Sequence, residues 1–238
     1  MLTIEESPTT TSPVPTAKKW RPRTKVLVAA GAGVAALGAT VAIDLAMAGT
    51  GHATAHFDQP IVRVDADIDS GSLRLVGSDD SRITIESTVH SGIRGPSHSE
   101  TIVGNRLVVR AKCPFDLIAT TCSVDYVIHV PNHVGVTAHG NGSNIDIASV
   151  HGDVDVSVNG GQVDLAFDAA PHHVKADANG GHINVVVPDD QSGYRVHTDT
   201  NGGSTNVGVR TDPTSDRTIT VETNGGDIDV RYADDGGA

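Results

Sequence analysis

The side chains best suited to chemistry are the 12 histidines and the many aspartates. His172 and His173 form the only histidine doublet, next to Pro171 in an expected turn, and we interpret them as solvated rather than metal-ligating. No HExxH, GxSxG, phosphate-loop or Cys/His-cluster motif is present. The NGGDIDV segment from Asn224 departs from the calcium-binding GGxGxD repeat, because its second glycine is missing and its aspartates fall elsewhere. The sequence therefore predicts a protein that is not an enzyme, with no catalytic residues, no metal site and no cofactor.

One set of Asp and Asn residues recurs at the same place after a glycine turn, which makes it the strongest candidate for a ligand surface. These residues are Asp146, Asp164, Asn184, Asn206 and Asp229. We expect them to face outward and to stack into a column. Neighbouring carboxylates in such a column repel unless they are hydrogen-bonded or neutralised by cations. We interpret the column as structural or solubilising, with a cation or ligand face as the open alternative.

The glycine turns belong to an internal repeat with a period near 20 residues. The triplet NGG begins at four asparagines and NGS begins at a fifth, with successive spacings of 18, 20, 22 and 23 residues. Asn-Gly favours tight turns because both residues tolerate positive φ. The predicted corner residues are Asn141, Gly142, Asn159, Gly160, Gly161, Asn179, Gly180, Gly181, Asn201, Gly202, Gly203, Asn224, Gly225 and Gly226. We expect positive φ at Gly180 and Gly202 in particular.

Short runs of alternating apolar and polar residues flank each triplet, so each unit is predicted to be strand, corner, strand. The residues expected to point inward are Val154, Val156, Val163, Leu165, Ile183, Val185, Val207, Val209, Ile219, Val221, Ile228 and Val230. Repetition of one corner favours an all-β, single-stranded β-solenoid of β-helix or β-roll type, because like residues stack in such a coil. A β-sandwich is the alternative. Segments 70–75 and 82–86 are expected to form the first, irregular rungs.

The segment DYVIHVPNHVGV, which ends at Val136, carries a resemblance to a known family. Tyr126, Ile128, Val130 and Pro131 match a Tyr-x-Ile-x-Val-Pro strand, and the repeats after it match Gly-x-Ile/Val-x-Val. Residues 60–232 therefore resemble the bacterial putative-adhesin family, a domain of unknown function. The resemblance implies a β-solenoid at the cell envelope, often tethered to the membrane, with no established catalytic residues.

The N-terminal quarter has the composition of a membrane anchor. Five basic residues and two glutamates lie in 1–25, and eighteen uncharged, mostly apolar residues follow from Val26 to Ile43. At about 1.5 Å per residue this run nearly spans a bilayer, and the basic flank stays in the cytoplasm. The expected organisation is a disordered cytoplasmic tail with a basic flank (1–25), a transmembrane helix or signal anchor (26–48), a linker (49–59), the β-solenoid (60–232) and a disordered tail (233–238). The alternative is secretion after cleavage near Ala48, because Ala46-Met47-Ala48 fits a signal-peptidase site.

The two cysteines, Cys113 and Cys122, lie nine positions apart in the part of the chain expected outside the cytoplasm. A disulfide is the default in an oxidising compartment. The spacing does not match a CxxC redox or metal pair.

Composition narrows the possible partners. Beyond residue 25 the chain holds 12 basic and 27 acidic residues, which is a formal charge of about −15, and aromatic residues make up only 3%. Such a surface repels phosphate backbones, so we exclude nucleic-acid binding. We expect a non-catalytic cell-surface scaffold or adhesin-like binding module that is held in the membrane by its N-terminal helix and contacts envelope polymers or other surface proteins. The alternatives are an envelope-stress sensing or regulatory component and, from a third class, a polysaccharide-cleaving enzyme with clustered acids.

Overall fold

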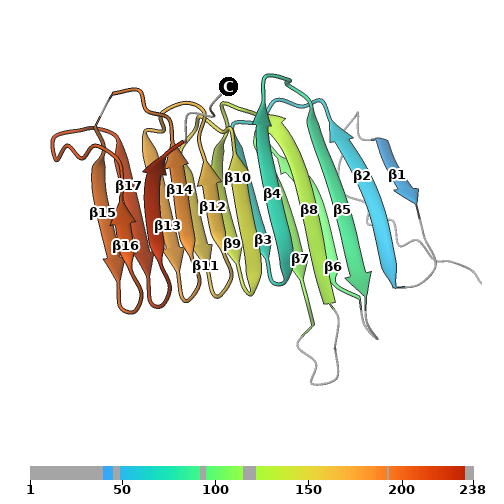
Figure 1. The fold of residues 1–238 in the computed structure, drawn as a ribbon. Coiled ribbons are helices and arrows are strands. Elements are labelled where there is room, and N and C mark those ends of the chain that lie inside the picture. The colour runs from blue at the N-terminus through green and yellow to red at the C-terminus, as the bar shows by residue number, and fades with distance from the viewer. Residues whose placement is uncertain (1–39, 45–48, 92–94, 115–121, 192, 234–238) are drawn as a thin grey trace, which may run out of the picture. The chain divides into compact units, whose positions relative to one another are not determined.

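The computed structural model describes residues 40–44, 49–91, 95–114, 122–191 and 193–233. The described residues form an all-β fold with two mixed sheets and contain no helix (Figure 1). In spatial order the ten-stranded sheet consists of β1 (Thr40–Asp44), β2 (Thr50–Phe57), β5 (Ile83–Ser91), β8 (Cys122–Pro131), β4 (Gly71–Ser78), β10 (Ser143–Ala148), β12 (Val163–Ala166), β14 (Ile183–Val187), β18 (Ile228–Tyr232) and β16 (Thr205–Val207). In spatial order the eight-stranded sheet consists of β15 (Arg195–Thr200), β17 (Thr218–Thr223), β13 (His173–Ala178), β11 (Val154–Val158), β9 (Gly135–Gly140), β3 (Arg63–Ile68), β7 (Arg106–Lys112) and β6 (Ser97–Val103).

From β9 onward the chain alternates between the two sheets, one strand in each. A strand of the eight-stranded sheet leads through a predicted corner into a strand of the ten-stranded sheet, and we call such a pair a rung. Successive rungs pair in parallel without register shifts, as in β9–β11–β13 and β10–β12–β14. Equivalent residues of the repeat therefore lie side by side in neighbouring strands.

The last two rungs do not stack in the order of the sequence. β17 pairs with β13 on one side and with β15 on the other, and β18 lies in the same way between β14 and β16. The C-terminal rung is thus inserted next to the rung of β13 and β14. The rung of β15 and β16 is the outermost one, and its strands form one edge of each sheet.

The N-terminal strands depart from the parallel pattern. β4 pairs in parallel with β10, which agrees with the rung predicted at 70–75. β5, which covers the rung predicted at 82–86, is antiparallel to both β2 and β8. That prediction is wrong because β5 extends the ten-stranded sheet in the opposite strand direction.

Two predicted boundaries are corrected near the N-terminus. The linker expected over 49–59 contains β2, whose main chain is paired with β5 along its whole length. Within the helix expected over 26–48, Thr40–Asp44 form β1 and pair with β2, in keeping with the β-branched residues of this segment. The rest of that predicted helix, the predicted tail 1–25 and residues 234–238 of the predicted tail 233–238 lie outside the described residues. Ala233, the first residue of that tail, donates its main-chain amide to Val187 at 2.8 Å. No helix among the described residues has the length and apolar composition needed to span a membrane.

The core lies between the two sheets and is built almost entirely from Val, Ile, Leu and Ala. Strands such as β11 and β14 alternate buried and less buried residues, as the period-two pattern predicts. Every residue predicted to point inward is buried except Val207, which is 36% exposed. That prediction is wrong because β16 is an outermost strand with no further rung to cover it.

The corner glycines fall into two classes, which the sequence did not separate. Gly180 has the expected positive φ of 109°, whereas Gly202 does not have a positive φ. The second glycine of the triplet is the constrained one. A Cβ on Gly181 would lie 1.8 Å from the carbonyl oxygen of Gly161, and one on Gly226 would lie 2.0 Å from that of Gly181. Only glycine lets the corners of adjacent rungs approach this closely.

The predicted disulfide between Cys113 and Cys122 is present, with 5.9 Å between the two Cα atoms. It joins the residue that follows β7 in one sheet to the first residue of β8 in the other. The bond therefore ties the two sheets together at the end of the core where the rungs are irregular.

We predict that Gly226→Ala lowers the free energy of unfolding by roughly 2 to 5 kcal/mol, from a positive-φ penalty of roughly 1 to 2 and overpacking of roughly 1 to 3. Gly225→Ala is the matched control, because its φ is not positive and a Cβ there meets nothing within 4 Å. We expect the control to change stability by less than about 1 kcal/mol. Urea unfolding of the full-length variants measures both values, and equal losses would contradict the stacking constraint.

Candidate functional site

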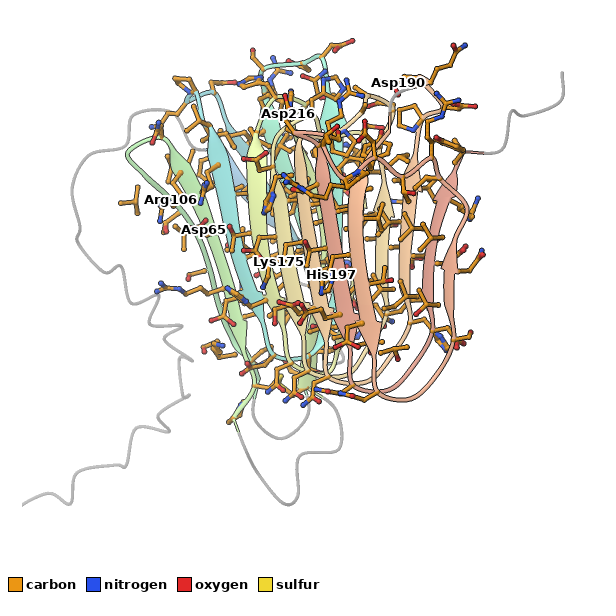
Figure 2. The ribbon with its side chains drawn as sticks, turned by 90° about the vertical axis from the view of Figure 1, so that its left-hand side faces the viewer. Asp65, Arg106, Lys175, Asp190, His197 and Asp216 are labelled. Carbon is orange, nitrogen blue, oxygen red and sulfur yellow. A yellow bond between two sulfur atoms is a disulfide. The ribbon has the colours of Figure 1, made fainter. Side chains whose placement is uncertain are left out.

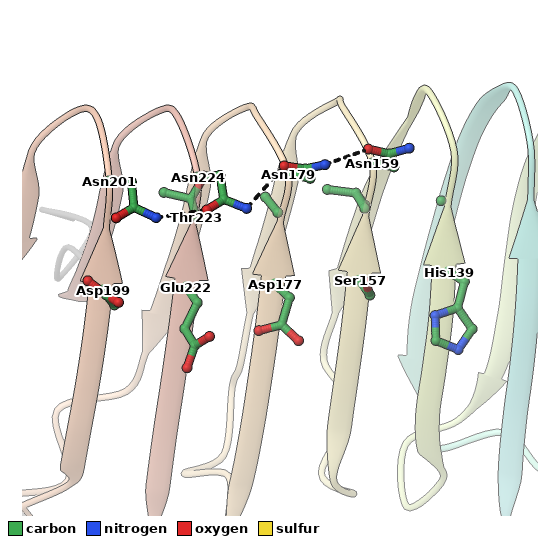
Figure 3. Close-up of a pocket in the computed structure, with 13 residues that line it drawn as sticks. His139, Ser157, Asn159, Asp177, Asn179, Asp199, Asn201, Glu222, Thr223 and Asn224 are labelled. Carbon is green, nitrogen blue, oxygen red and sulfur yellow. Dashed lines mark hydrogen bonds between the residues drawn. The ribbon is translucent and has the colours of Figure 1, made fainter.

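The five corner asparagines form a continuous ladder of side-chain hydrogen bonds. Figure 3 shows the part of the ladder from Asn201 to Asn159. Each Nδ2 donates to the Oδ1 of the next asparagine, from Asn201 through Asn224, Asn179 and Asn159 to Asn141, over 2.8 to 3.2 Å. The ladder exists because stacked corners bring identical amides to hydrogen-bonding distance. It follows the spatial order of the rungs rather than their order in the sequence.

A groove of about 530 Å³ runs beside this ladder on the outer face of the eight-stranded sheet (Figure 3). Its floor is a row of side chains at equivalent positions of adjacent strands: His139, Ser157, Asp177, Glu222 and Asp199. The last three of these, Asp177, Glu222 and Asp199, are consecutive in space, and we call them the acidic row. The groove therefore offers amides along its rim and carboxylates along one half of its floor.

The acidic row is only partly neutralised. Lys175 donates to one oxygen of Asp177, and this hydrogen bond raises the pKa of the lysine. The other oxygen of Asp177 is buried and has no hydrogen-bond partner among the described residues. Within the described part of the chain, neither Glu222 nor Asp199 has an ion pair with a basic residue. The groove consequently favours cationic groups over anionic ones.

Basic residues occur on the same outer face, but they lie outside the acidic row. Lys175 and His197 occupy one row of positions, separated by Thr220 (Figure 2). Towards the other end of the sheet Asp65 pairs with Arg106 at 2.9 Å. No group of three or more His, Cys, Asp or Glu side chains in the described ranges has the arrangement needed to hold a metal ion.

The predicted Asp and Asn column lies on the ten-stranded sheet. The strand register places Asp146 next to Asp164, then Asn184, Asp229 and Asn206. Asn184 donates to Asp164 at 3.4 Å, and Asn206 donates to Asp229 at 2.7 Å. The amides therefore separate carboxylates that would otherwise be neighbours along most of the column.

Asp146 and Asp164 are the one adjacent carboxylate pair in this column. Burial raises the pKa of Asp146, and the neighbouring charge of Asp164 adds to the rise while Arg74 opposes it. Arg74 approaches Asp146 at 3.5 Å and Gln162 donates to Asp164 at 2.9 Å. These contacts from within the chain hold most of the column, although the Oδ1 of Asn184 is buried and has no hydrogen-bond partner among the described residues. The arrangement fits a structural or solubilising role.

The histidine doublet takes no part in either surface. His172 and His173 are exposed, and the Nδ1 of His173 lies 2.6 Å from the Oγ1 of Thr218. His173 is the first residue of β13 rather than part of a turn.

A hydrogen-bonded group that the sequence did not predict joins the two sheets. The Tyr126 hydroxyl donates to Glu100 at 2.6 Å, and His98 contacts the same carboxylate oxygen at 3.1 Å. Tyr126 comes from β8 of one sheet, while Glu100 and His98 come from β6 at the edge of the other. Tyr126 stood out in the sequence as part of a strand motif, but its partners lie more than twenty residues away, and nothing in the sequence linked them.

These contacts shift all three pKa values. Burial by itself raises the pKa of Glu100, but the hydrogen bonds from His98 and Tyr126 outweigh it and leave that pKa lowered. The hydrogen bond to Glu100 raises the pKa of His98. Burial, followed by the charge of Glu100, raises the pKa of Tyr126 far above its ordinary value, so the phenol remains a neutral donor.

Comparison with known proteins identifies the fold. No family model matches the chain, and no curated protein matches it. The crystal structure of a putative cell adhesion protein from Clostridium sporogenes ATCC 15579 is similar with a TM-score of 0.55 and 10% identity, over 82% of this chain and 99% of that one. The crystal structure of a putative adhesin from Bacteroides fragilis NCTC 9343 aligns with a TM-score of 0.38 and 13% identity, over 76% of this chain and 97% of that one. At such identity the first similarity shows that the two proteins share a fold.

We predict that Glu100→Gln destabilises the protein by roughly 1 to 3 kcal/mol, because it removes a charge-assisted contact between the sheets. The lowered pKa of Glu100 means that its contribution is present above its ordinary value of 4.5 and is lost as pH falls through the lowered pKa. The raised pKa of His98 means that its contribution is present below 6.5 and is lost as pH rises through the raised pKa. The loss of stability in Glu100→Gln relative to the parent should therefore be largest between pH 4.5 and pH 6.5.

Thermal unfolding across this pH range measures the effect. Glu86→Gln is the matched control, because Glu86 is an exposed glutamate on β5. If the stability difference between Glu100→Gln and the parent did not change with pH, or if Glu86→Gln lost as much stability, Glu100 would act only through packing.

Proposed function

We propose that this chain is a non-catalytic, adhesin-like binding module of the cell envelope, and that the groove beside the asparagine ladder is its binding surface. The observation that carries the proposal is the groove itself, where hydrogen-bonding side chains repeat once per strand along several strands. An extended ligand lying across the strands would meet the same contacts at intervals of about 4.8 Å. The shared fold with a protein described as a putative cell adhesion protein supports the same class of function.

The charge of the groove selects among possible ligands. The acidic row lacks enough basic neighbours to balance it, so a cationic segment of a surface protein or envelope polymer fits better than an anionic one. The described groove lining contains no Phe, Tyr or Trp, the large rings that proteins commonly use to stack on flat ligands. We therefore infer that recognition in the groove is polar and electrostatic.

The architecture is proposed to be a β-solenoid that follows a membrane anchor. In-register parallel pairing of rungs, with one corner type and one asparagine ladder, supports a coil over a sandwich. The basic flank before Val26 and the apolar run after it support an anchor with the domain outside the cytoplasm. The disulfide agrees with an oxidising compartment.

The anchor and β1 compete for the same residues. Thr40–Asp44 pair with β2 in the structure, so they cannot also lie within a bilayer-spanning helix. In the anchored form that we propose, either the helix ends before Thr40 or β1 leaves β2. Cleavage near Ala48, the secreted alternative, would separate β1 from the rest of the chain.

We predict that the full-length chain binds a decalysine peptide and does not bind decaglutamate. Asp199→Asn combined with Glu222→Gln should weaken decalysine binding roughly threefold to tenfold, as expected for the loss of two exposed ion pairs. Asp164→Asn combined with Asp229→Asn is the matched control, with the same change of charge on the other sheet. Fluorescence anisotropy with labelled peptide measures all three affinities. Equal losses in the two double variants, or no binding by the parent, would contradict a binding site in the groove.

We predict that the β-domain is exposed on the outside of the cell. Protease added to intact, wall-stripped cells should digest an epitope tag placed after Ala238, while a cytoplasmic marker stays intact. Protection of the tag in cells whose marker is also protected would reverse the proposed topology.

A further inference from the structure

The outermost rung presents two strand edges that no other described strand covers. β15 is the edge of the eight-stranded sheet and β16 is the edge of the ten-stranded sheet. β15 alternates exposed and half-buried residues, and β16 is exposed throughout, in contrast to the buried pattern of the inner rungs. This end of the core therefore has main-chain and side-chain groups available for a further strand.

The main-chain pairing defines which groups are available. The amide of Arg195 donates to the carbonyl of Arg217, just before β17, at 2.8 Å, and the amide of Asn201 donates to the carbonyl of Thr223, the last residue of β17, at 3.2 Å. Because main-chain groups alternate along a strand, those of Val196, Thr198 and Thr200 point away from β17. Before them the edge is already closed, because Tyr194 pairs with the segment around Thr211. The free stretch is thus short and is centred on Thr198.

We propose that this edge pairs with the same edge of a second copy of the chain, antiparallel and about a two-fold axis at Thr198. Val196 then pairs with the partner's Thr200, and Thr198 pairs with the partner's Thr198. This register joins every free group of the stretch and avoids the closed position at Tyr194. The axis also suits β16. Asn206 lies as far after the corner residue Gly202 as Thr198 lies before it, so the same axis meets both strands of the rung.

The charges on β15 favour this register. Arg195, His197 and Asp199 share the exposed face of the strand. Arg195 and Asp199 are about 13 Å apart along one strand, so they cannot pair with each other. In the proposed pair His197 lies opposite the partner's Asp199, and Arg195 reaches the same carboxylate diagonally. The next possible register towards the corner would put Asp199 against the partner's Asp199, which repels.

The partner also completes the acidic row. Asp199 lies beside Glu222 in this row, and neither has an ion pair with a basic residue within the described part of the chain. A second copy supplies an arginine and a histidine at the open end of the row. The contact therefore relieves a repulsion that the isolated chain retains.

The pairing places the N-terminal strands of the two copies far apart, whether or not the chain has a membrane anchor. β1 and β16 are the two opposite edges of the ten-stranded sheet. Two copies joined through their outermost rungs thus have their N-terminal strands at the two far ends of the pair. If each copy is held in a membrane, as proposed above, this arrangement suits a contact between two facing surfaces.

The contact is small, so the pair is expected to be weak. One short strand from each sheet contributes on each side, which is well below the roughly 1,200 to 2,000 Å² of a stable interface. Association should therefore be seen at high micromolar concentration and should be strengthened by many copies on a surface.

Sedimentation velocity of the full-length chain in mild detergent, from about 10 to about 500 µM, tests the pairing. We expect a concentration-dependent dimer for the parent. Thr198→Pro should abolish it while keeping the thermal midpoint, because the lost N–H does not face β17. Asp199→Lys should also abolish it, since the lysine would face His197 and Arg195 of the partner subunit. Asp153→Lys is the matched control, an exposed acidic residue away from the edge, and should keep the dimer.

A charge swap gives the decisive measurement. A chain with Asp199→Lys and a chain with Arg195→Asp and His197→Asp should each be monomeric alone and should form a heterodimer when mixed. A parent that remains monomeric up to about 500 µM would overturn the proposal. So would a dimer that persists in both Thr198→Pro and Asp199→Lys, or a mixture of the swapped chains that fails to associate. Should Thr198→Pro fail to fold, the charge variants and their mixture decide the question.

Discussion

The close approach of stacked corners is the constraint on which the rest of this structure depends. In the four NGG triplets the second glycine lies so near the carbonyl of an adjacent rung that no side chain fits, as the 1.8 Å gap for a Cβ on Gly181 shows. Stacking the rungs about 4.8 Å apart brings these corners together where the chain turns between the two sheets. The corner then fixes the register of the strands on both sides of it. Because register is fixed, residues at equivalent positions of the repeat lie side by side in neighbouring rungs.

Copying one residue type from rung to rung has opposite effects for amides and for carboxylates. An asparagine at the corner can donate to one neighbour and accept from the other, so the ladder from Asn201 to Asn141 satisfies itself. A carboxylate can only accept, so stacked acids repel. On the ten-stranded sheet Asn184 and Asn206 relieve that repulsion. On the eight-stranded sheet Asp177 is the one member of the acidic row with an ion pair to a basic residue among the described residues, and the same Lys175 also feels the charge of Glu222. This imbalance distinguishes the groove from the column and makes the groove the better candidate for binding.

The two ends of the core are completed in different ways. At the N-terminal end, antiparallel strands, a disulfide and the contact between Tyr126 and Glu100 join the sheets. At the other end, the insertion of β17 and β18 leaves the rung of β15 and β16 outermost. That rung has the same strands and corner as the inner rungs but has no rung beyond it. A repeat whose outer edge resembles its inner edges is suited to receive another strand.

The sequence alone predicted the all-β class, the corners, the alternation that buries residues such as Val156 and Leu165, and the disulfide. These features are local, or they follow from a short repeat whose period is visible in one chain. The tertiary structure decided the order of the rungs, because the repeat in the sequence is equally regular whichever rung lies outermost. That order in turn decided the exposure of Val207. The tertiary structure also decided which glycine of each corner is constrained, since Gly203 has a positive φ and lies against the carbonyl of Gly226, whereas Gly202 has neither feature. The contact between Tyr126 and Glu100 and the acidic row join strands that are distant in sequence, and only pairing across the sheets brings such side chains together.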